Sequence, residues 1–301
     1  MKYIAQTAGG MEDISIKEIE ELIGVRAEKL QEGRVLFDTT NQKATELLNA
    51  RSIFRVYEFV QEIEFSSFED LLKKVKTFEI EDPFVVRCQR EGDHRFQSLD
   101  AEKEIGELFY NKGHKVDLHN PKTIIIADII NNKCFLGKDL TNDNDLSKRE
   151  YRVKAHSKAI NATLAYGVLR LAGWTKDKSL FNPECKDGVI AIEAALWAKD
   201  PKEITATDSQ ITSVTAAEIN SKLAGVHKHI KFTEPKKTNY IITQLIRIDN
   251  LFEKAEELLT DKGTILIITQ KENVNPRCFK LVNKREVKVH KAKYFLLTFE
   301  K

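Results

Sequence analysis

The sequence predicts an α/β protein in two parts, a small α+β half followed by a half built on a mainly parallel β-sheet. The first 65 residues alternate strand and helix patterns, which suggests a small α+β sandwich. After residue 149 strands and helices alternate regularly, and several strands are continuously apolar. Such strands are typical of a parallel sheet that helices cover on both faces. The length of 301 residues fits two domains more readily than one.

The elements of the N-terminal half follow from local patterns. A strand at 3–5 precedes a helix through Ile23, and Glu12 and Asp13 in the first turn of that helix favour its dipole. The other elements predicted are strands at 33–37, 56–65, 83–90, 116–118, 123–130 and 133–137, and helices at 43–48, 68–75 and 100–111. The polar, acidic stretch from Asp139 to Arg149 has no periodicity and is predicted to be a linker.

The C-terminal half is predicted from the alternation of its elements. The helices expected are 159–171, 188–198, 211–223 and 251–259, and the strands are 179–181, 204–207, 230–233, 240–243, 264–269, 287–289 and 294–299. The last two strands follow each other directly, so we expect an antiparallel hairpin to finish the parallel sheet.

Composition excludes several classes of protein. With a formal net charge of +2, the molecule as a whole does not attract nucleic acid electrostatically, so any RNA site has to be a local basic patch. No apolar run approaches membrane-spanning length and no signal peptide is visible at the start. The four cysteines are widely spaced, without a paired-cysteine zinc motif. We therefore expect a cytoplasmic protein without a structural metal.

Basic residues gather where the strand at 83–90 ends. Arg87, Arg90, His94 and Arg95 lie close in sequence to Phe96, and these residue types suit phosphate binding and base stacking. The alternative is a solvated turn with Phe96 in the core. Lys115, Lys122 and Lys138 add positive charge later in the same unit, but only a shared face would make them part of one site.

Two positions in the C-terminal half suit a nucleotide site. The segment 181–188 (FNPECKDG) joins the first strand of the sheet to a helix, where free backbone N–H groups bind ligands in α/β domains. Only Gly188 gives the close backbone approach that such loops need, so a turn capped by Asp187 is the alternative. Asp208 ends the second strand and could bind two ribose hydroxyls or cap the next helix. Cys185 is interpreted as a buried packing residue.

Together these segments resemble one family. Residues 7–13 (TAGGMED) and 86–96 (VRCQREGDHRF) resemble the ferredoxin-like plus THUMP module of RNA-modifying enzymes, and 146–152 (LSKREYR) resembles the joint that follows it. Residues 189–196 (VIAIEAAL) and 220–226 (NSKLAGV) are similar to the Rossmann-like domain of THUMP-bearing guanine-N2 methyltransferases that act on tRNA and rRNA.

The resemblance implies four regions and a set of partners. The regions are a ferredoxin-like domain at 1–65, a THUMP RNA-binding domain at 66–140, a linker at 141–155 and a Rossmann-like class I methyltransferase domain at 156–301. The implied partner is tRNA, held at its acceptor end by the THUMP domain. The implied cofactor is S-adenosylmethionine, with Asn182, Gly188 and Asp208 at its site.

The sequence departs from the family where the chemistry is expected. The family loop Asp-Pro-x-Cys-Gly-Ser-Gly is Asn182 to Gly188 here, and Lys186 replaces a glycine. The family Asn-Pro-Pro-Tyr is matched by 244–247, so Gln244 keeps an amide and Arg247 replaces the aromatic residue.

These changes predict a tRNA-binding protein that has lost or weakened catalysis. The cofactor is S-adenosylmethionine if the protein is active and none if it is not. The alternative is an active S-adenosylmethionine-dependent guanine-N2 methyltransferase that uses Gln244. A weaker third interpretation is a domain that takes another ligand into the old pocket.

Overall fold

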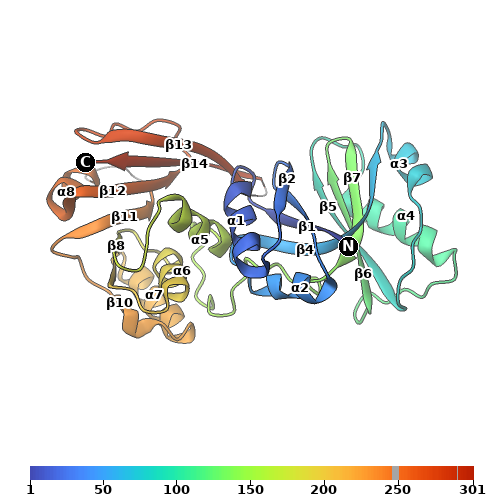
Figure 1. Cartoon of the computed structure of the whole chain (residues 1–301), viewed down its shortest axis with the longest axis horizontal. Coiled ribbons are helices and arrows are strands. Elements are labelled where there is room, and N and C mark those ends of the chain that lie inside the picture. The colour runs from blue at the N-terminus through green and yellow to red at the C-terminus, as the bar shows by residue number, and fades with distance from the viewer. Residues whose placement is uncertain (246–250, 290) are drawn as a thin grey trace. The chain divides into compact units, whose positions relative to one another are not determined.

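The computed structural model describes residues 1–245, 251–289 and 291–301, and Figure 1 labels its elements. These residues form two compact units. The first comprises 1–6, 19–50 and 54–145, and the second comprises 7–18, 51–53 and 146–301. Each unit is built on one seven-stranded sheet in the described part of the chain. No helix there is both long enough and apolar enough to span a membrane.

The first sheet has the strand order β2-β3-β1-β4-β7-β6-β5. Its strands are β1 (Lys2–Thr7), β2 (Ala27–Gln31), β3 (Arg34–Asp38), β4 (Ile53–Glu64), β5 (Phe84–Glu91), β6 (Thr123–Ile130) and β7 (Lys133–Asp139). Its helices are α1 (Glu12–Ile23), α2 (Asn41–Glu46), α3 (Phe68–Lys74) and α4 (Ser98–Tyr110), with a 3-10 turn at Leu47–Asn49. The long strand β4 pairs with β7, while β5 and β6 run parallel at the other edge. One sheet therefore runs from the N-terminal strands into the 66–140 region.

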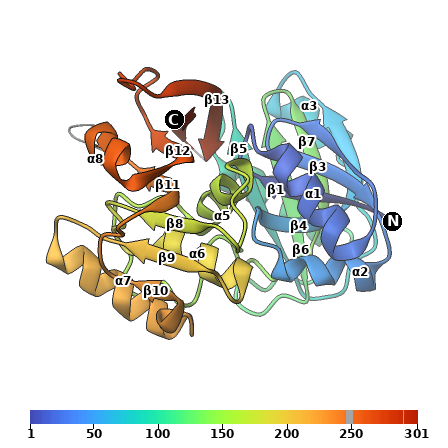
Figure 2. The same cartoon turned by 60° about the vertical axis from the view of Figure 1, so that its left-hand side comes forward.

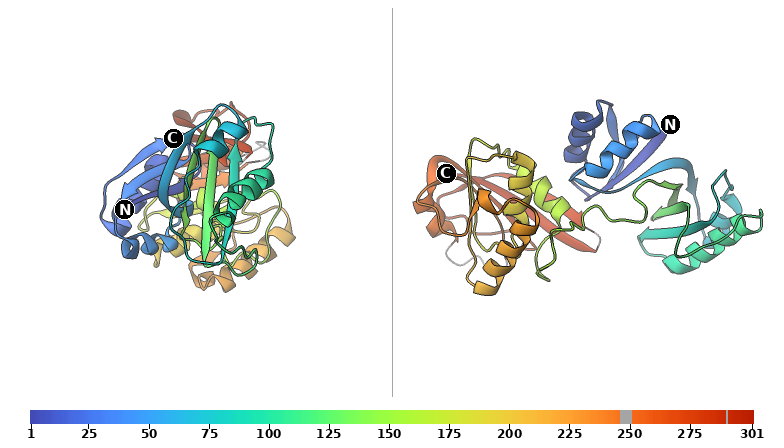
Figure 3. Two further views of the ribbon diagram at one scale, coloured as in Figure 1. Left: turned by 90° about the vertical axis from the view of Figure 1, so that its right-hand side faces the viewer. Right: turned by 90° about the horizontal axis from the view of Figure 1, so that it is seen from below.

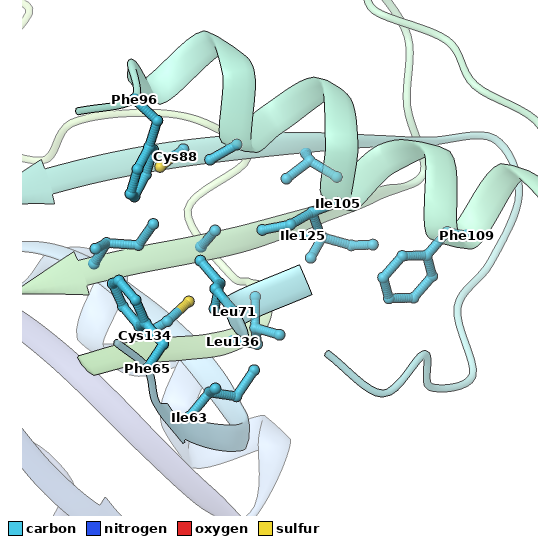
Figure 4. Close-up of a cluster of buried hydrophobic side chains, with 14 of the residues drawn as sticks. Ile63, Phe65, Leu71, Cys88, Phe96, Ile105, Phe109, Ile125, Cys134 and Leu136 are labelled. Carbon is cyan, nitrogen blue, oxygen red and sulfur yellow. The ribbon is translucent and has the colours of Figure 1, made fainter. Parts of the chain in front are cut away.

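Helices α3 and α4 pack against this sheet (Figure 3), and a hydrophobic core fills the space between them and the sheet (Figure 4). Alternate residues of β5, including Val86 and Cys88, point toward α4, where they meet Ile105 and Phe109. Phe96 is only 8% exposed, and its ring stacks on Phe68 with ring centroids 4.4 Å apart. The structure thus supports the interpretation of Phe96 as a core residue, and its ring is not available for base stacking.

A buried ion pair lies in the same unit. The guanidinium of Arg34 on β3 donates to both carboxylate oxygens of Asp128 on β6, with Nη2 2.6 Å from Oδ1. The hydroxyl of Tyr57 donates to Asp128 Oδ2 at 3.0 Å. The Asp128 side chain is fully buried and that of Arg34 is 4% exposed. Burial and the Asp128 carboxylate raise the pKa of Tyr57, so the hydroxyl stays a donor.

The second sheet has the strand order β10-β9-β8-β11-β12-β14-β13 (Figure 2). Its strands are β8 (Ser179–Asn182), β9 (Glu203–Ala206), β10 (Ile230–Lys231), β11 (Thr238–Gln244), β12 (Leu259–Thr269), β13 (Lys280–Val289) and β14 (Ala292–Glu300). Its helices are α5 (Ala162–Leu171), α6 (Val189–Ala198), α7 (Ile211–Leu223) and α8 (Leu251–Leu258), with a 3-10 turn at His227–His229. Strands β10 to β12 are parallel, and β14 and β13 close the sheet antiparallel, which confirms the predicted hairpin.

Part of the N-terminal sequence belongs to this second unit. Gly9 forms a backbone bridge with Lys288 on β13, and Arg285 on the same strand donates to Asp13 at 2.7 Å. Gly167 on α5 lies against Met11, because a Cβ at residue 167 would come within 2.6 Å of the Met11 methyl group. The start of α1 is therefore part of the packing around α5 and β13.

A buried carboxylate on α6 binds two other segments of the same unit. The fully buried Glu193 accepts from Arg51 at 2.8 Å, from Arg149 at 3.1 Å and from the Tyr151 hydroxyl at 2.8 Å. Arg149 and Tyr151 come from the segment predicted to be a linker. Burial and the Glu193 charge raise the pKa of Tyr151, which remains a donor. This part of the predicted linker is thus fixed to the second unit.

Three local predictions need correction. The predicted strand at 116–118 is a single bridge between Val116 and Phe84. Helix α5 begins at Ala162 rather than residue 159, because the Asn161 side chain accepts from Leu164 N at 2.8 Å and caps the helix there. Asp187 does not cap α6, whose N-cap is Gly188 without a side-chain cap bond.

Candidate functional site

A cavity of about 410 Å³ lies beyond the carboxyl ends of β8 and β9. The order of the parallel strands reverses between β8 and β11, next to the loop after β8 that lines this cavity, and α/β sheets bind ligands at such crevices. Its lining includes two positively charged residues, Lys158 and Lys186, and two negatively charged ones, Glu184 and Asp208. The remaining lining residues are His156, Ser157, Ser209, Gln210 and Ser213.

Lys186 occupies the loop between β8 and α6 in a left-handed conformation with φ of +53°. Residues other than glycine rarely adopt this backbone conformation. The Lys186 residue is 5% exposed, and its Nζ donates to Gln244 O at 2.9 Å and to Glu184 O at 3.3 Å. Burial lowers the pKa of the Lys186 ammonium, while the Glu184 and Asp208 carboxylates act to raise it. The loop thus places a cation inside the protein at the cavity.

Gln244 ends β11, and both atoms of its amide are already used. Its Oε1 accepts from Ile160 N at 3.0 Å, and its Nε2 donates to Lys158 O at 2.8 Å. The residue is 8% exposed. The amide therefore holds the segment before α5, while Oε1 keeps one acceptor position and Nε2 keeps one hydrogen. Arg247, the other predicted catalytic residue, lies outside the described residues.

The three predicted cofactor residues lie on neighbouring elements. Asn182 is buried at the end of β8, and its Nδ2 donates to Ile242 O at 2.9 Å, whereas no partner for Oδ1 is found in the described part of the chain. Asp208 Oδ2 accepts from Lys186 N and Oδ1 accepts from Gln210 N, both at 2.9 Å. A carboxylate has about four acceptor positions, so Asp208 can still bind hydroxyl groups.

Gly188 is required here for packing. Its φ is +82°, and an added Cβ would lie 2.8 Å from the Ala217 Cβ on α7. The preceding Asp187 is fully buried and pairs with Arg152, whose Nη2 lies 2.7 Å from Oδ2. The charge of Asp187 is therefore balanced by the segment before α5.

A second cavity, of about 380 Å³, lies on the other side of Gln244 and Lys158. The two cavities share Lys158 in their linings. Tyr294 from β14 and Thr269 and Lys271 from the end of β12 also line this second cavity. Reasoning from the sequence missed Lys158, Tyr294 and Lys271, because only the tertiary fold brings the ends of β11, β12 and β14 to the segment before α5.

These residues do not fit S-adenosylmethionine in the arrangement that the resemblance implies. Asp208 lies at the cavity, where it could bind ribose hydroxyls. However, the buried Lys186 ammonium is held at the same cavity, and S-adenosylmethionine, with a sulfonium, an ammonium and one carboxylate, has a net positive charge. The sulfonium and the fixed ammonium repel each other.

Cys185 follows the expectation of a buried packing residue. It is 3% exposed, and burial, with a smaller contribution from the Asp208 carboxylate, raises the pKa of its thiol to about 12. A thiol with this pKa is a poor nucleophile at neutral pH.

N-ethylmaleimide is therefore expected to modify the exposed Cys278 in the folded protein and to leave Cys185 unmodified. Peptide mass spectrometry after timed labelling measures both sites in one experiment. Full denaturation before labelling is the control, because it should make both thiols equally accessible. Modification of Cys185 in the native protein as fast as Cys278 would contradict the assignment.

The basic residues at the end of β5 do not share one face of the sheet. Arg90 points to the side of α3 and α4, and its guanidinium lies 5.5 Å from the centre of the Phe96 ring. Arg87 is three residues earlier and points to the opposite face, because neighbouring side chains of a strand alternate. Arg95 is exposed in the loop after β5. The His94 ring packs on Phe65, and its Nε2 lies 2.6 Å from Asn131 O.

Arg87 has an acidic partner in the stretch predicted as a linker. Its Nε donates to Asp143 Oδ2 at 2.7 Å, and Asp143 also pairs with Arg55 at 3.2 Å. Although partial burial acts to raise it, the pKa of Asp143 is lowered by these two arginines. The charge of Arg87 is thus partly balanced.

The three predicted lysines are spread over the unit. Lys115 and Lys122 are exposed in the connection between α4 and β6. Lys138 on β7 pairs in register with Ile125, which belongs to the core under α4, so it shares the face of Arg90 and not that of Arg87. Its Nζ lies 3.9 Å from Glu58 Oε2.

Comparisons with known proteins agree with this architecture. Residues 56–139 match the THUMP domain family, and residues 149–246 match the family described as RMKL-like, methyltransferase domain. The crystal structure of TrmN from Thermus thermophilus superposes with a TM-score of 0.80 and 24% identity, covering 100% of this chain and 99% of that one. The fold is thus an N-terminal THUMP region followed by a class I methyltransferase fold.

Curated relatives carry related names. A tRNA (guanine(6)-N2)-methyltransferase of Archaeoglobus fulgidus is 32% identical over 215 residues, which are 66% of this chain and 54% of that protein. The enzyme of the same name from Methanocaldococcus jannaschii is 31% identical over 218 residues, 66% of this chain and 57% of that one. The chain spans about half the length of these relatives. Two separate regions of the chain thus match a THUMP domain and an RMKL-like methyltransferase domain.

Proposed function

We propose that this protein binds tRNA through its THUMP region in the cytoplasm and that its methyltransferase-like domain has lost or weakened methyl transfer. The single observation that carries the proposal is the state of Gln244, whose amide is committed at both atoms to Lys158 and Ile160. These two bonds fix the orientation of the amide, so a guanine amino group would have to reach the one remaining acceptor position of Oε1 in that orientation.

The position of Lys186 supports the same proposal. Its Nζ donates to the backbone carbonyl of Gln244, so the loop after β8 and the end of β11 are tied together between the two cavities. Methyl transfer depends on holding the two reacting atoms in line, and a misplacement of about 1 Å can reduce the rate by roughly a hundredfold. A link between the cavities opposes such an alignment.

Binding of tRNA is proposed from the THUMP match and the names of the relatives. Arg90, Arg95 and Lys122 are the cations of this unit that we expect to meet phosphates, and the acceptor end of tRNA is the proposed ligand. In this proposal the ferredoxin-like domain spans 1–65, the THUMP domain 66–140, the linker 141–155 and the methyltransferase-like domain 156–301.

A second candidate function is an active S-adenosylmethionine-dependent tRNA guanine-N2 methyltransferase. The relatives named tRNA (guanine(6)-N2)-methyltransferase favour it, as does the position of Asp208 at the cavity. In this case Lys186 and Gln244 would have to exchange their present partners when the substrates bind.

The two candidates differ in one measurement. The purified protein is mixed with S-adenosylmethionine and tRNA transcribed without modifications, and digested nucleosides are analysed by mass spectrometry for N2-methylguanosine. We expect tRNA to be bound and no repeated turnover to occur. Multiple turnovers per protein molecule would overturn the proposal and establish the second candidate. A tRNA-free reaction and a heat-denatured sample are the controls.

A further inference from the structure

The cavity beyond β8 and β9 has an unusual balance of charge for a site that would take a cationic cofactor. Its lining carries two ammonium groups, Lys158 and Lys186, and two carboxylates, Glu184 and Asp208, so the formal charges cancel. Without Lys186 the lining would carry a net negative charge and would attract a cation. The presence of Lys186 removes that attraction.

The position of Lys186 makes its charge act strongly on a ligand in the cavity. Lys158 is exposed and its charge is screened by water, whereas Lys186 is 5% exposed and is fixed by the carbonyl oxygens of Glu184 and Gln244. Its nearest carboxylate, Glu184 Oε2, lies 3.9 Å away. A fixed cation with little water around it acts on a ligand much more strongly than an exposed one.

The rest of the cavity suits a nucleoside. Asp208 lies at the end of β9, 20 residues after Gly188, and retains acceptor positions for a ribose diol. Ser209, Gln210 and Ser213, at the start of α7, add polar groups to the same lining. None of these features requires the ligand to carry a charge.

We infer that this cavity binds adenosine-type nucleosides that lack a sulfonium and that Lys186 discriminates against those that carry one. S-adenosylhomocysteine lacks the methyl group and the sulfonium charge of S-adenosylmethionine and keeps its ammonium and carboxylate, whereas adenosine lacks the whole amino-acid part. The ratio of the affinities for S-adenosylhomocysteine and S-adenosylmethionine therefore measures how the charge of the cavity acts on the sulfonium. The inference concerns the same cavity as the proposed function, but it does not depend on tRNA or on methyl transfer.

The test is calorimetric titration of the full-length protein with adenosine, S-adenosylhomocysteine and S-adenosylmethionine. The unchanged protein should bind S-adenosylhomocysteine at least about tenfold more tightly than S-adenosylmethionine. Lys186→Met keeps most of the side-chain volume and removes the charge, so it should reduce this ratio at least about tenfold. Lys186→Gly should do the same and suits the left-handed backbone at residue 186, which guards against a folding defect in the first variant.

Lys199→Met and Lys199→Gly are the matched controls. Lys199 is also a lysine with a positive φ, +61°, but it is exposed at the end of α6 and does not line the cavity. These variants should leave the ratio unchanged. The inference is overturned if the unchanged protein binds none of the three ligands, or if the ratio is the same with and without Lys186.

The failure of this inference and the failure of the proposed function can be told apart. Repeated methyl transfer to tRNA would overturn the proposed function whatever the binding ratio. A ratio that does not respond to residue 186 would overturn the inference even in a protein that never methylates tRNA.

Discussion

Replacing Asp128 by alanine is expected to cost the first unit roughly 3–5 kcal/mol of stability. The change removes the carboxylate that accepts two hydrogen bonds from the buried Arg34 guanidinium and leaves Glu91, whose Oε1 lies 3.2 Å from Nη2, as its acidic partner. It also removes the acceptor of the Tyr57 hydroxyl. Removing one member of a buried pair is much more costly than losing an exposed ion pair.

The thiol of Cys134 provides a local measurement of this loss. Cys134 is fully buried on β7, next to β6, and becomes accessible to a thiol reagent only when this sheet opens. Labelling of Cys134 across a urea series should shift to lower urea in the variant. This local probe is preferable because a chain of two units need not unfold in one step.

Two further variants make the stability prediction specific. Asp70→Ala removes a partly exposed carboxylate that pairs with Lys74 within one helix and accepts from Ser66 N, and it should shift the Cys134 transition much less than Asp128→Ala does. Arg34→Met combined with Asp128→Leu replaces the buried pair by apolar side chains and should recover much of the loss. If Asp128→Ala behaves like Asp70→Ala, the ion pair does not support the sheet.

Changing Arg87, Arg90 and Arg95 together to alanine is expected to weaken tRNA binding by at least about tenfold at moderate salt. Removing one ion pair between an arginine and a phosphate should reduce the slope of log affinity against log salt by roughly 0.7–0.9. Most of the effect should come from Arg90 and Arg95, because Arg87 lies on the opposite face of the sheet and is already paired with Asp143. Filter binding of tRNA at several salt concentrations measures both affinity and slope.

The matched control for this experiment changes Lys176, Lys199 and Lys202 to alanine. These changes remove the same formal charge from exposed positions in the second unit. Equal losses of affinity in both triple variants would mean that only net charge matters, and an unchanged slope in the arginine variant would remove these residues from the RNA site.

Local patterns in the sequence predicted most of the fold. Helix α7 and strand β6 have the predicted limits. Strand β6 is a clear apolar run bounded by polar residues, whereas the buried side of α7 is made of small and polar residues. The predicted patch of arginines is different. Strand alternation alone places Arg87 and Arg90 on opposite faces, so the information was in the sequence but the interpretation as one patch did not use it.

The contacts that decide the chemistry of the site could not be predicted from the sequence. Nothing in the local pattern indicates that the amide of Gln244 binds backbone atoms more than 80 residues away, or that the Lys186 side chain turns inward to Gln244. Such contacts depend on how β11, the loop after β8 and the segment before α5 are placed by the whole sheet. Sequence reasoning located the departures from the family but not their geometry.

The inclusion of residues 7–18 and 51–53 in the second unit has a consequence for synthesis on the ribosome. Met11, Asp13 and Arg51 leave the ribosome before Gly167, Arg285 and Glu193, with which they pack or pair in the finished protein. The apolar side chains at the beginning of α1 therefore stay exposed to water until almost the whole chain has left the ribosome. A nascent chain halted near residue 145 should be open to proteases at residues 7–18, and release of the complete chain should protect them.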